Sequence, residues 1–124
     1  MIIKSYEINK LNFDQIKLIL FYGKNEGLKN ETTNNLLKDK KTIERFDEKE
    51  ILENTNTFLE NIFSKSLFES EKIITIKRVT DKILKIIEEI AEKEIEDIKI
   101  ILNADILEKK SKLRSFFEKS KKYV

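Results

Sequence analysis

The chain has 124 residues, the size of one domain, and contains no cysteine and no histidine. These absences exclude a disulfide framework, a cysteine or histidine metal centre, and the usual general base near neutral pH. Charged residues make up 39% of the chain, but the net charge is only +2, so charge alone does not argue for a nucleic-acid partner.

Strand-like and helix-like segments alternate from the first third of the chain onward. The apolar run 17–22 ends at Gly23 and predicts a strand that is buried on both faces. A helix is expected over 25–38, with its core face formed by Leu28, Leu36 and Leu37. Residues 42–46 predict a short peripheral strand, and 48–52 a single helical turn.

The central part of the chain predicts two further amphipathic helices around a strand. Asn54 or Thr55 is expected to cap the first helix, whose apolar stripe is formed by Phe58, Leu59, Ile62 and Phe63. A strand is expected over 72–79. Thr80 is expected to cap the second helix, whose buried face is formed by Ile83, Ile86, Ile87 and Ile90.

The last third predicts a buried strand over 98–102 and a helix over 110–119, with Leu113, Phe116 and Phe117 on its apolar face. Residues 123–124 resemble the start of another strand. Strands separated by helices of this length predict βαβ units, hence an α/β fold with a parallel sheet and helices on both faces. We expect a single αβ domain over 1–124, taken from a longer protein. The longest apolar runs are strand-sized, so we expect a cytoplasmic protein without a membrane span.

A glycine turn follows the first strand, at the place where a nucleotidase holds phosphate. A phosphate loop has the pattern G-x-x-x-x-G-K-[ST], but Gly23 and Gly27 are one residue too close, and Lys29 is displaced. Asn30 replaces the hydroxyl residue that would hold magnesium, and Glu26 adds negative charge. We therefore interpret the segment as a plain strand-to-helix turn that does not bind ATP.

An apolar pair, Leu67 and Phe68, lies between the helix that begins near residue 55 and the strand that begins near residue 72. Turns at such places are normally polar. The residues themselves leave two interpretations open. The pair either folds back over the edge of the core or inserts into a partner.

Three motifs, in register over nearly the whole chain, resemble one known family. They are Leu20-Phe21-Tyr22-Gly23 followed by Asn25, Glu26, Leu28 and Glu31; Ser66-Leu67-Phe68 with Ser70 before Lys72-Ile73-Ile74-Thr75-Ile76-Lys77-Arg78; and the strand 98–102 with Lys109-Lys110-Ser111-Lys112-Leu113. In this order they resemble the N-terminal domain of the delta subunit of bacterial DNA polymerase III, a clamp-loader subunit. The chain departs from the family at Asn25, where aspartate is frequent, and at Gly27, where a large hydrophobe is frequent.

The resemblance implies an AAA+ or P-loop NTPase-like domain without a functional phosphate loop, and a non-catalytic role within a nucleotidyltransferase holoenzyme. It implies that Leu67 and Phe68 bind the beta sliding clamp and help to open the ring, with a rim formed by Ser66, Glu69 and Ser70. The implied partners are the clamp, the gamma/tau and delta prime subunits, and DNA indirectly through the loader. Neither cofactor nor metal is implied.

Two other function classes compete with this interpretation. A nucleic-acid-binding module would use the basic residues near the C-terminus, namely Lys109, Lys110, Lys112, Arg114, Lys119, Lys121 and Lys122, which Glu108 and Glu118 interrupt. An enzyme would use carboxylates such as Asp47, Glu48, Glu50, Glu88 and Glu89. No nucleophile, ligand set or phosphate loop accompanies those carboxylates in the sequence, so we expect no catalysis.

Overall fold

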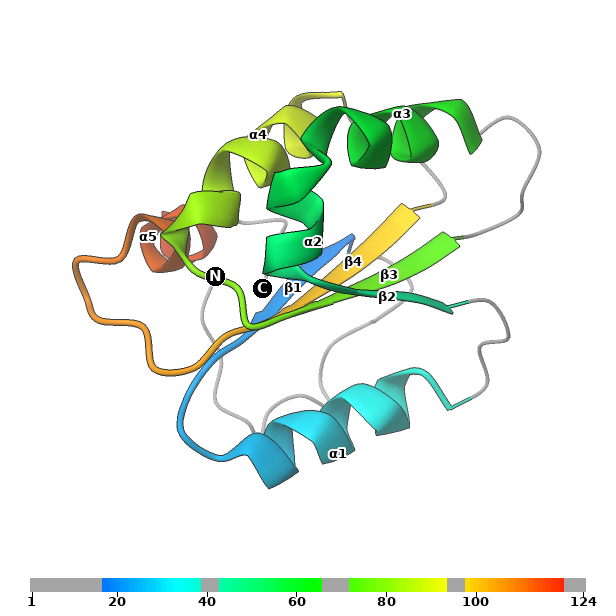
Figure 1. Cartoon of the computed structure of the whole chain (residues 1–124). Coiled ribbons are helices and arrows are strands. Elements are labelled where there is room, and N and C mark those ends of the chain that lie inside the picture. Colours follow the sequence, from blue (N-terminus) through cyan, green and yellow to red (C-terminus); the bar gives the residue numbers. More distant parts are fainter. Residues whose placement is uncertain (1–16, 39–42, 66–71, 94–97, 120–124) are drawn as a thin grey trace.

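The computed structural model describes residues 17–38, 43–65, 72–93 and 98–119 (Figure 1). Its strands are β1 (Leu18–Phe21), β2 (Ile43–Asp47), β3 (Lys72–Lys77) and β4 (Ile98–Asn103). They form one sheet in the order β1-β4-β3-β2, and each neighbouring pair is parallel. The predicted α/β fold with a parallel sheet is therefore confirmed, as is the peripheral position of β2.

Helices cover both faces of this sheet. They are α1 (Glu26–Leu36), α2 (Glu48–Glu53), α3 (Thr55–Lys65), α4 (Leu84–Glu92) and α5 (Lys112–Lys119), with a short 3₁₀ turn, η3 (Asp81–Ile83), before α4. The chain crosses from β1 to β2 in one direction and returns through β3 to β4 in the other. Because parallel crossovers are right-handed, the two directions place their helices on opposite faces. Figure 1 shows this arrangement, with α1 on one side of the sheet and α2, α3 and α4 on the other.

The main core lies between the sheet and the layer formed by α2, α3, α4 and α5. Alternate residues of β3 and β4 face this layer, and the fully buried ones include Ile74, Ile76, Ile100 and Leu102. The predicted isoleucine face of α4 is confirmed, since Ile83, Ile86, Ile87 and Ile90 are all at most 6% exposed. The predicted stripe of α3 is confirmed as well: Phe58 and Ile62 are buried, and Leu59 and Phe63 pack against the same cluster. Leu113 and Phe117 anchor α5 there, and Phe116 is partly buried.

The opposite face of the sheet has a smaller apolar cluster under α1. It contains Ile73, Ile101 and Leu37, with Phe21 and Ile43 packed against it. The prediction that Leu28 faces the core is wrong, because its side chain is 41% exposed. Lys29 and Thr33 are buried in its place. With Leu37, they are spaced by four residues and form the inner face of α1.

Polar contacts fix the ends of several helices. As predicted, the Thr80 hydroxyl accepts a hydrogen bond from the backbone N–H of Lys82 at 3.2 Å. The same threonine donates its hydroxyl to the buried carboxylate of Glu48 at 2.7 Å, which ties the start of α2 to the turn after β3. Of the two residues predicted as the accepting cap of α3, Asn54 and Thr55, Thr55 does not have this role. Its hydroxyl donates to the carbonyl of Ile51 at 3.1 Å, near the end of α2, and the same carbonyl also accepts the N–H of Asn54 at 3.2 Å.

Candidate functional site

The five residues expected to bind a partner lie outside the described residues: Ser66, Leu67, Phe68, Glu69 and Ser70. The elements on either side of them are described. Helix α3 ends at Lys65, after packing on the sheet through Phe58 and Ile62, and β3 begins at Lys72. Because β3 lies between β2 and β4, segment 66–71 connects a packed helix to a central strand at the amino ends of the sheet. The expected strand at 123–124 also lies outside the described residues.

The glycine turn connects β1 to α1 at the carboxyl ends of the strands. Gly23 has a φ of 131°, a conformation that L side chains rarely adopt, so glycine is required there. Its N–H donates to the carbonyl of Asp105 at 3.2 Å, which joins the turn to the chain after β4. Gly27 has no such need, because an added Cβ would meet only the side chain of Asn25 at an ordinary 3.6 Å.

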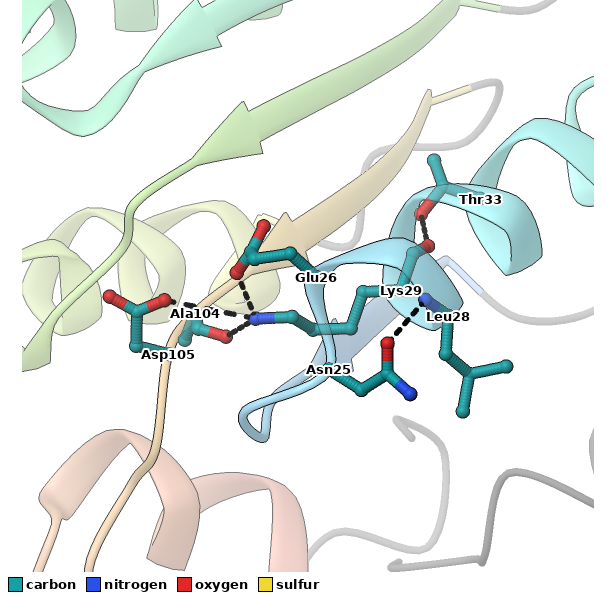
Figure 2. Close-up of polar contacts among 7 residues, drawn as sticks. All are labelled: Asn25, Glu26, Leu28, Lys29, Thr33, Ala104 and Asp105. Atoms are coloured by element: carbon teal, nitrogen blue, oxygen red, sulfur yellow. Dashed lines mark hydrogen bonds and ion pairs between the residues drawn. The ribbon is translucent and has the colours of Figure 1, made fainter.

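Asn25 caps the first turn of α1. Its Oδ1 accepts a hydrogen bond from the backbone N–H of Leu28 at 2.9 Å (Figure 2). Glu26 follows at the first helical position, where a carboxylate complements the positive end of the helix dipole. Thus the helix start already carries an acceptor and an anion from its own chain, which are the groups that a bound phosphate would otherwise supply.

Lys29 points from α1 toward the end of β4. Its Nζ donates a 2.6 Å hydrogen bond to the carbonyl of Ala104 and lies 2.5 Å from Glu26 Oε1 and 3.9 Å from Asp105 Oδ1 (Figure 2). The lysine side chain is only 7% exposed. Lys29 reaches these partners only from the inner face of α1. Leu28, the preceding residue on the helix, therefore points toward solvent.

The ion pair between Lys29 and Glu26 also determines the charge of the glycine turn. The pKa of the Glu26 carboxyl lies below its ordinary value, chiefly because Lys29 donates a hydrogen bond to it. The two side chains neutralise each other, and the ammonium is directed to a protein carbonyl.

In open α/β sheets, ligands bind outside the carboxyl ends of strands where neighbouring connections leave on opposite faces. In this sheet the connections after β1 and β4 leave on opposite faces, and Lys29 connects the two strand ends through its hydrogen bond to Ala104.

In a phosphate-loop enzyme, magnesium is held by a loop hydroxyl and a carboxylate after a nearby strand. Here Asp105 follows β4, but Asn30 stands in place of the loop hydroxyl. Strand β3 runs into Lys77 and Arg78, which are both basic. Strand β4 ends at Asn103, whose buried Oδ1 has no hydrogen-bond partner. Within the described residues, no group of three or more potential metal ligands comes together.

The basic cluster near the C-terminus is only partly available to a ligand. Arg114 donates from Nε to Glu118 at 2.8 Å and from Nη1 to the carbonyl of Leu107 at 2.9 Å, and its guanidinium lies 5.3 Å from the ring centroid of Tyr22. The Glu118 hydrogen bond also raises the pKa of Arg114. Lys110 pairs with Glu108 at 3.3 Å. Arg114 therefore fixes the start of α5 to β1, and Lys121 and Lys122 lie outside the described residues.

Asp81 is a structural carboxylate that the sequence did not single out. Its Oδ1 accepts from the Ser111 hydroxyl at 2.6 Å and from the Leu113 N–H at 3.1 Å, and its Oδ2 accepts from the Lys112 N–H at 3.3 Å. These donors, led by the Ser111 hydroxyl, lower the pKa of Asp81. The residue caps α5 from a turn thirty residues away, and no local sequence pattern reports such a contact. For Lys29, a signal existed in its four-residue spacing to Thr33 and Leu37.

The described helices include none that is both long and apolar enough to span a bilayer. No protein-family model matches the chain, and no curated protein matches it.

Proposed function

We propose that this chain is a clamp-loader domain of the delta-subunit type, which binds the beta sliding clamp through Leu67 and Phe68 and helps to open the ring. Two lines of support come together here. The three motifs follow the order of that family over nearly the whole chain. The all-parallel sheet with helices on both faces is also the architecture that an AAA+-like domain requires.

The observation that carries the proposal is the position of the apolar pair. Helix α3 already buries its own stripe through Phe58 and Ile62, and β3 starts its buried run at Lys72. Leu67 and Phe68 come between these two packed elements, in a segment whose other residues are polar or charged. An apolar pair framed by polar residues, on a connection fixed at both ends, suits a plug that enters a pocket on a partner.

The energetics suit such a plug. Complete burial of a leucine and a phenylalanine contributes roughly 3 to 6 kcal/mol. Association itself costs several kcal/mol, so the plug must act together with a rim, for which Ser66, Glu69 and Ser70 are the candidates. A domain that binds an opened clamp more tightly than a closed one shifts the ring toward the open state without any chemistry of its own.

The glycine turn supports a non-catalytic role within this proposal. Lys29 forms a hydrogen bond with Ala104 and an ion pair with Glu26. The lysine near the glycine turn therefore connects two parts of the protein instead of being available to a phosphate. ATP hydrolysis would then belong to the gamma/tau subunits, with delta prime completing the loader. DNA would be reached indirectly, through the assembled complex.

The proposal is tested by titrating the cognate sliding clamp onto the immobilised 124-residue chain in a surface plasmon resonance experiment. We expect saturable binding that is competed by a short clamp-binding peptide of the kind polymerases carry, because both would occupy one apolar pocket. Absence of binding at clamp concentrations up to about 100 μM, where a Kd corresponds to roughly −5 kcal/mol, would contradict the proposal.

A further inference from the structure

An open pocket of about 670 Å³ lies at the carboxyl ends of β3 and β4, the two central strands of the sheet. The turn after β3 forms one wall, and the loop between β4 and α5 forms the other. Its apolar lining comes from Val79, Ile106 and Leu107. Ile106 is 56% exposed, the highest value among the large hydrophobic residues that the structure describes.

The acidic side chains of the pocket are engaged within the protein. Asp81 accepts the hydrogen bonds that cap α5, Glu108 pairs with Lys110 at 3.3 Å, and Asp105 lies 3.9 Å from Lys29. The basic side chains are less engaged. Lys82 and Lys112 line the pocket and form no ion pair with any other residue of the described ranges. The pocket lining has four basic and three acidic side chains, so its net charge is positive.

Arg78 is a third basic residue of the pocket, and its backbone has an unfavourable conformation. It is the one non-glycine residue with a positive φ, 56°, among those the structure describes. This left-handed conformation is strained for a residue with a side chain, and glycine or asparagine would adopt it more easily. The guanidinium is 81% exposed, and its Nη1 donates a long, 3.4 Å hydrogen bond to the Asp47 carboxylate in a surface ion pair. Strain of this kind at the edge of a pocket is typical of functional positions.

Several backbone donors around the pocket that could hold a phosphate group are already used. The N–H of Val79 donates to Asn103, that of Thr80 to Glu48, and that of Lys112 to Asp81. The residues that line the pocket include no aromatic side chain on which a base would stack. Side-chain cations around an apolar floor suit carboxylates and an aliphatic or aromatic side chain instead.

We infer that this pocket is a docking site for an acidic segment of a partner protein, whose apolar side chain packs on Ile106 and Leu107 while its carboxylates pair with Arg78, Lys82 and Lys112. The inference goes beyond clamp binding and does not rest on it, since the two surfaces share no residue.

The test uses a fluorescein-labelled peptide, Asp-Asp-Glu-Leu-Phe-Glu-Asp-Asp, and the 124-residue chain at about 0.15 M salt, where surface charges more than roughly 8 Å apart are screened. Fluorescence anisotropy gives the Kd. We expect saturable binding, and at least tenfold weaker binding when serine replaces the leucine and phenylalanine of the peptide. Equal binding of the two peptides would overturn the inference. Displacement of the first peptide by a 20-nucleotide single strand at the same concentration would also overturn it, since the pocket would then be a general polyanion site.

Two variants with the same change in net charge locate the binding. Lys82→Glu with Lys112→Glu reverses two cations of the pocket. Lys85→Glu with Lys119→Glu reverses two exposed cations outside it and serves as the control. We expect the pocket variant to bind the peptide at least tenfold more weakly than the control variant, with both folded by circular dichroism. Equal weakening by the two variants would place the binding elsewhere and overturn the inference.

Discussion

The ammonium group of Lys29 donates a 2.6 Å hydrogen bond to the backbone carbonyl of Ala104, 75 residues further along the chain. This contact connects α1 to the end of β4 across the place where an open α/β sheet would bind a ligand. It also explains the rotation of α1, which buries a lysine and exposes Leu28. One side chain therefore sets the packing of a helix and joins the carboxyl ends of β1 and β4 at this place.

Removal of the Lys29 ammonium will destabilise the domain. Lys29→Met keeps the length of the buried side chain but leaves the Ala104 carbonyl without its donor, and an unsatisfied buried acceptor costs about 1 to 3 kcal/mol. Urea unfolding of the wild type and the variant at pH 7 measures the loss. The control is Lys24→Met, because Lys24 is exposed on the same turn. Equal stability of the two variants would show that the Ala104 contact contributes nothing.

ATP will not bind at the glycine turn. The start of α1 is satisfied by Asn25 and Glu26, and Lys29 faces the protein. We expect the melting temperature to change by less than about 1 °C in 5 mM ATP with magnesium, since a ligand stabilises a fold only in proportion to ln(1 + [L]/Kd). A saturable increase of several degrees would mean that the turn opens to admit a triphosphate.

The Asp81 carboxylate will make stability depend on pH in acid. Its pKa is lower in the folded state than its ordinary value of 3.8, so its contribution is complete above about pH 4 and is lost as the pH falls through the folded pKa. Asp81→Ala removes three accepted hydrogen bonds at the start of α5, which we expect to cost about 1 to 2 kcal/mol at pH 7.

Urea unfolding at pH 7 and at pH 2.5 checks this expectation. The gap in unfolding free energy between the wild type and Asp81→Ala should narrow at the lower pH, because a carboxylate whose folded pKa is lowered loses its contribution to stability as the pH falls below its ordinary value of 3.8. Glu60→Ala, at an exposed position of α3, provides a comparison whose gap should stay small at both values. A gap for Asp81→Ala that is independent of pH would show that the carboxylate charge has no part in the cap.

Arg78→Gly is expected to maintain or raise the free energy of unfolding while it weakens binding of the acidic peptide. Arg78→Gly relieves a left-handed conformation, so we expect its free energy of unfolding to equal that of the wild type or to exceed it by up to about 1 kcal/mol. Lys77→Gly, at the last residue of β3, should lower it by about 0.5 to 1 kcal/mol, because glycine loses more conformational freedom on folding and relieves no strain there. The same Arg78 variant should bind the acidic peptide less well. If Arg78→Gly loses as much stability as Lys77→Gly, the residue is not strained.

The sequence predicted the elements that depend on periodicity. The isoleucines of α4 and the stripe of α3 repeat at helical spacing, and the buried strands read as continuous apolar runs, so local pattern was sufficient for them. The helix α1 was predicted, but the orientation of Leu28 was wrong, because a lysine counts as polar in any pattern, whereas Lys29 is buried through its contacts with Glu26 and Ala104.

Contacts between distant segments were not predictable in the same way. The strand order β1-β4-β3-β2 and the capping of α5 by Asp81 depend on which segments meet in space, and a single sequence carries no local signal for that. The clamp-binding residues Leu67 and Phe68 were proposed from the resemblance, and they stay a prediction.

The affinity of the sliding clamp for a plug variant is the measurement that decides the proposed function. By surface plasmon resonance, we expect Leu67→Ala with Phe68→Ala to weaken clamp binding at least a hundredfold, with the melting temperature nearly unchanged. Leu28→Ala with Leu52→Ala, which truncates two exposed leucines elsewhere, should bind the clamp as the wild type does. A plug variant that unfolds, or one that binds the clamp as tightly as the wild type, would contradict the proposal.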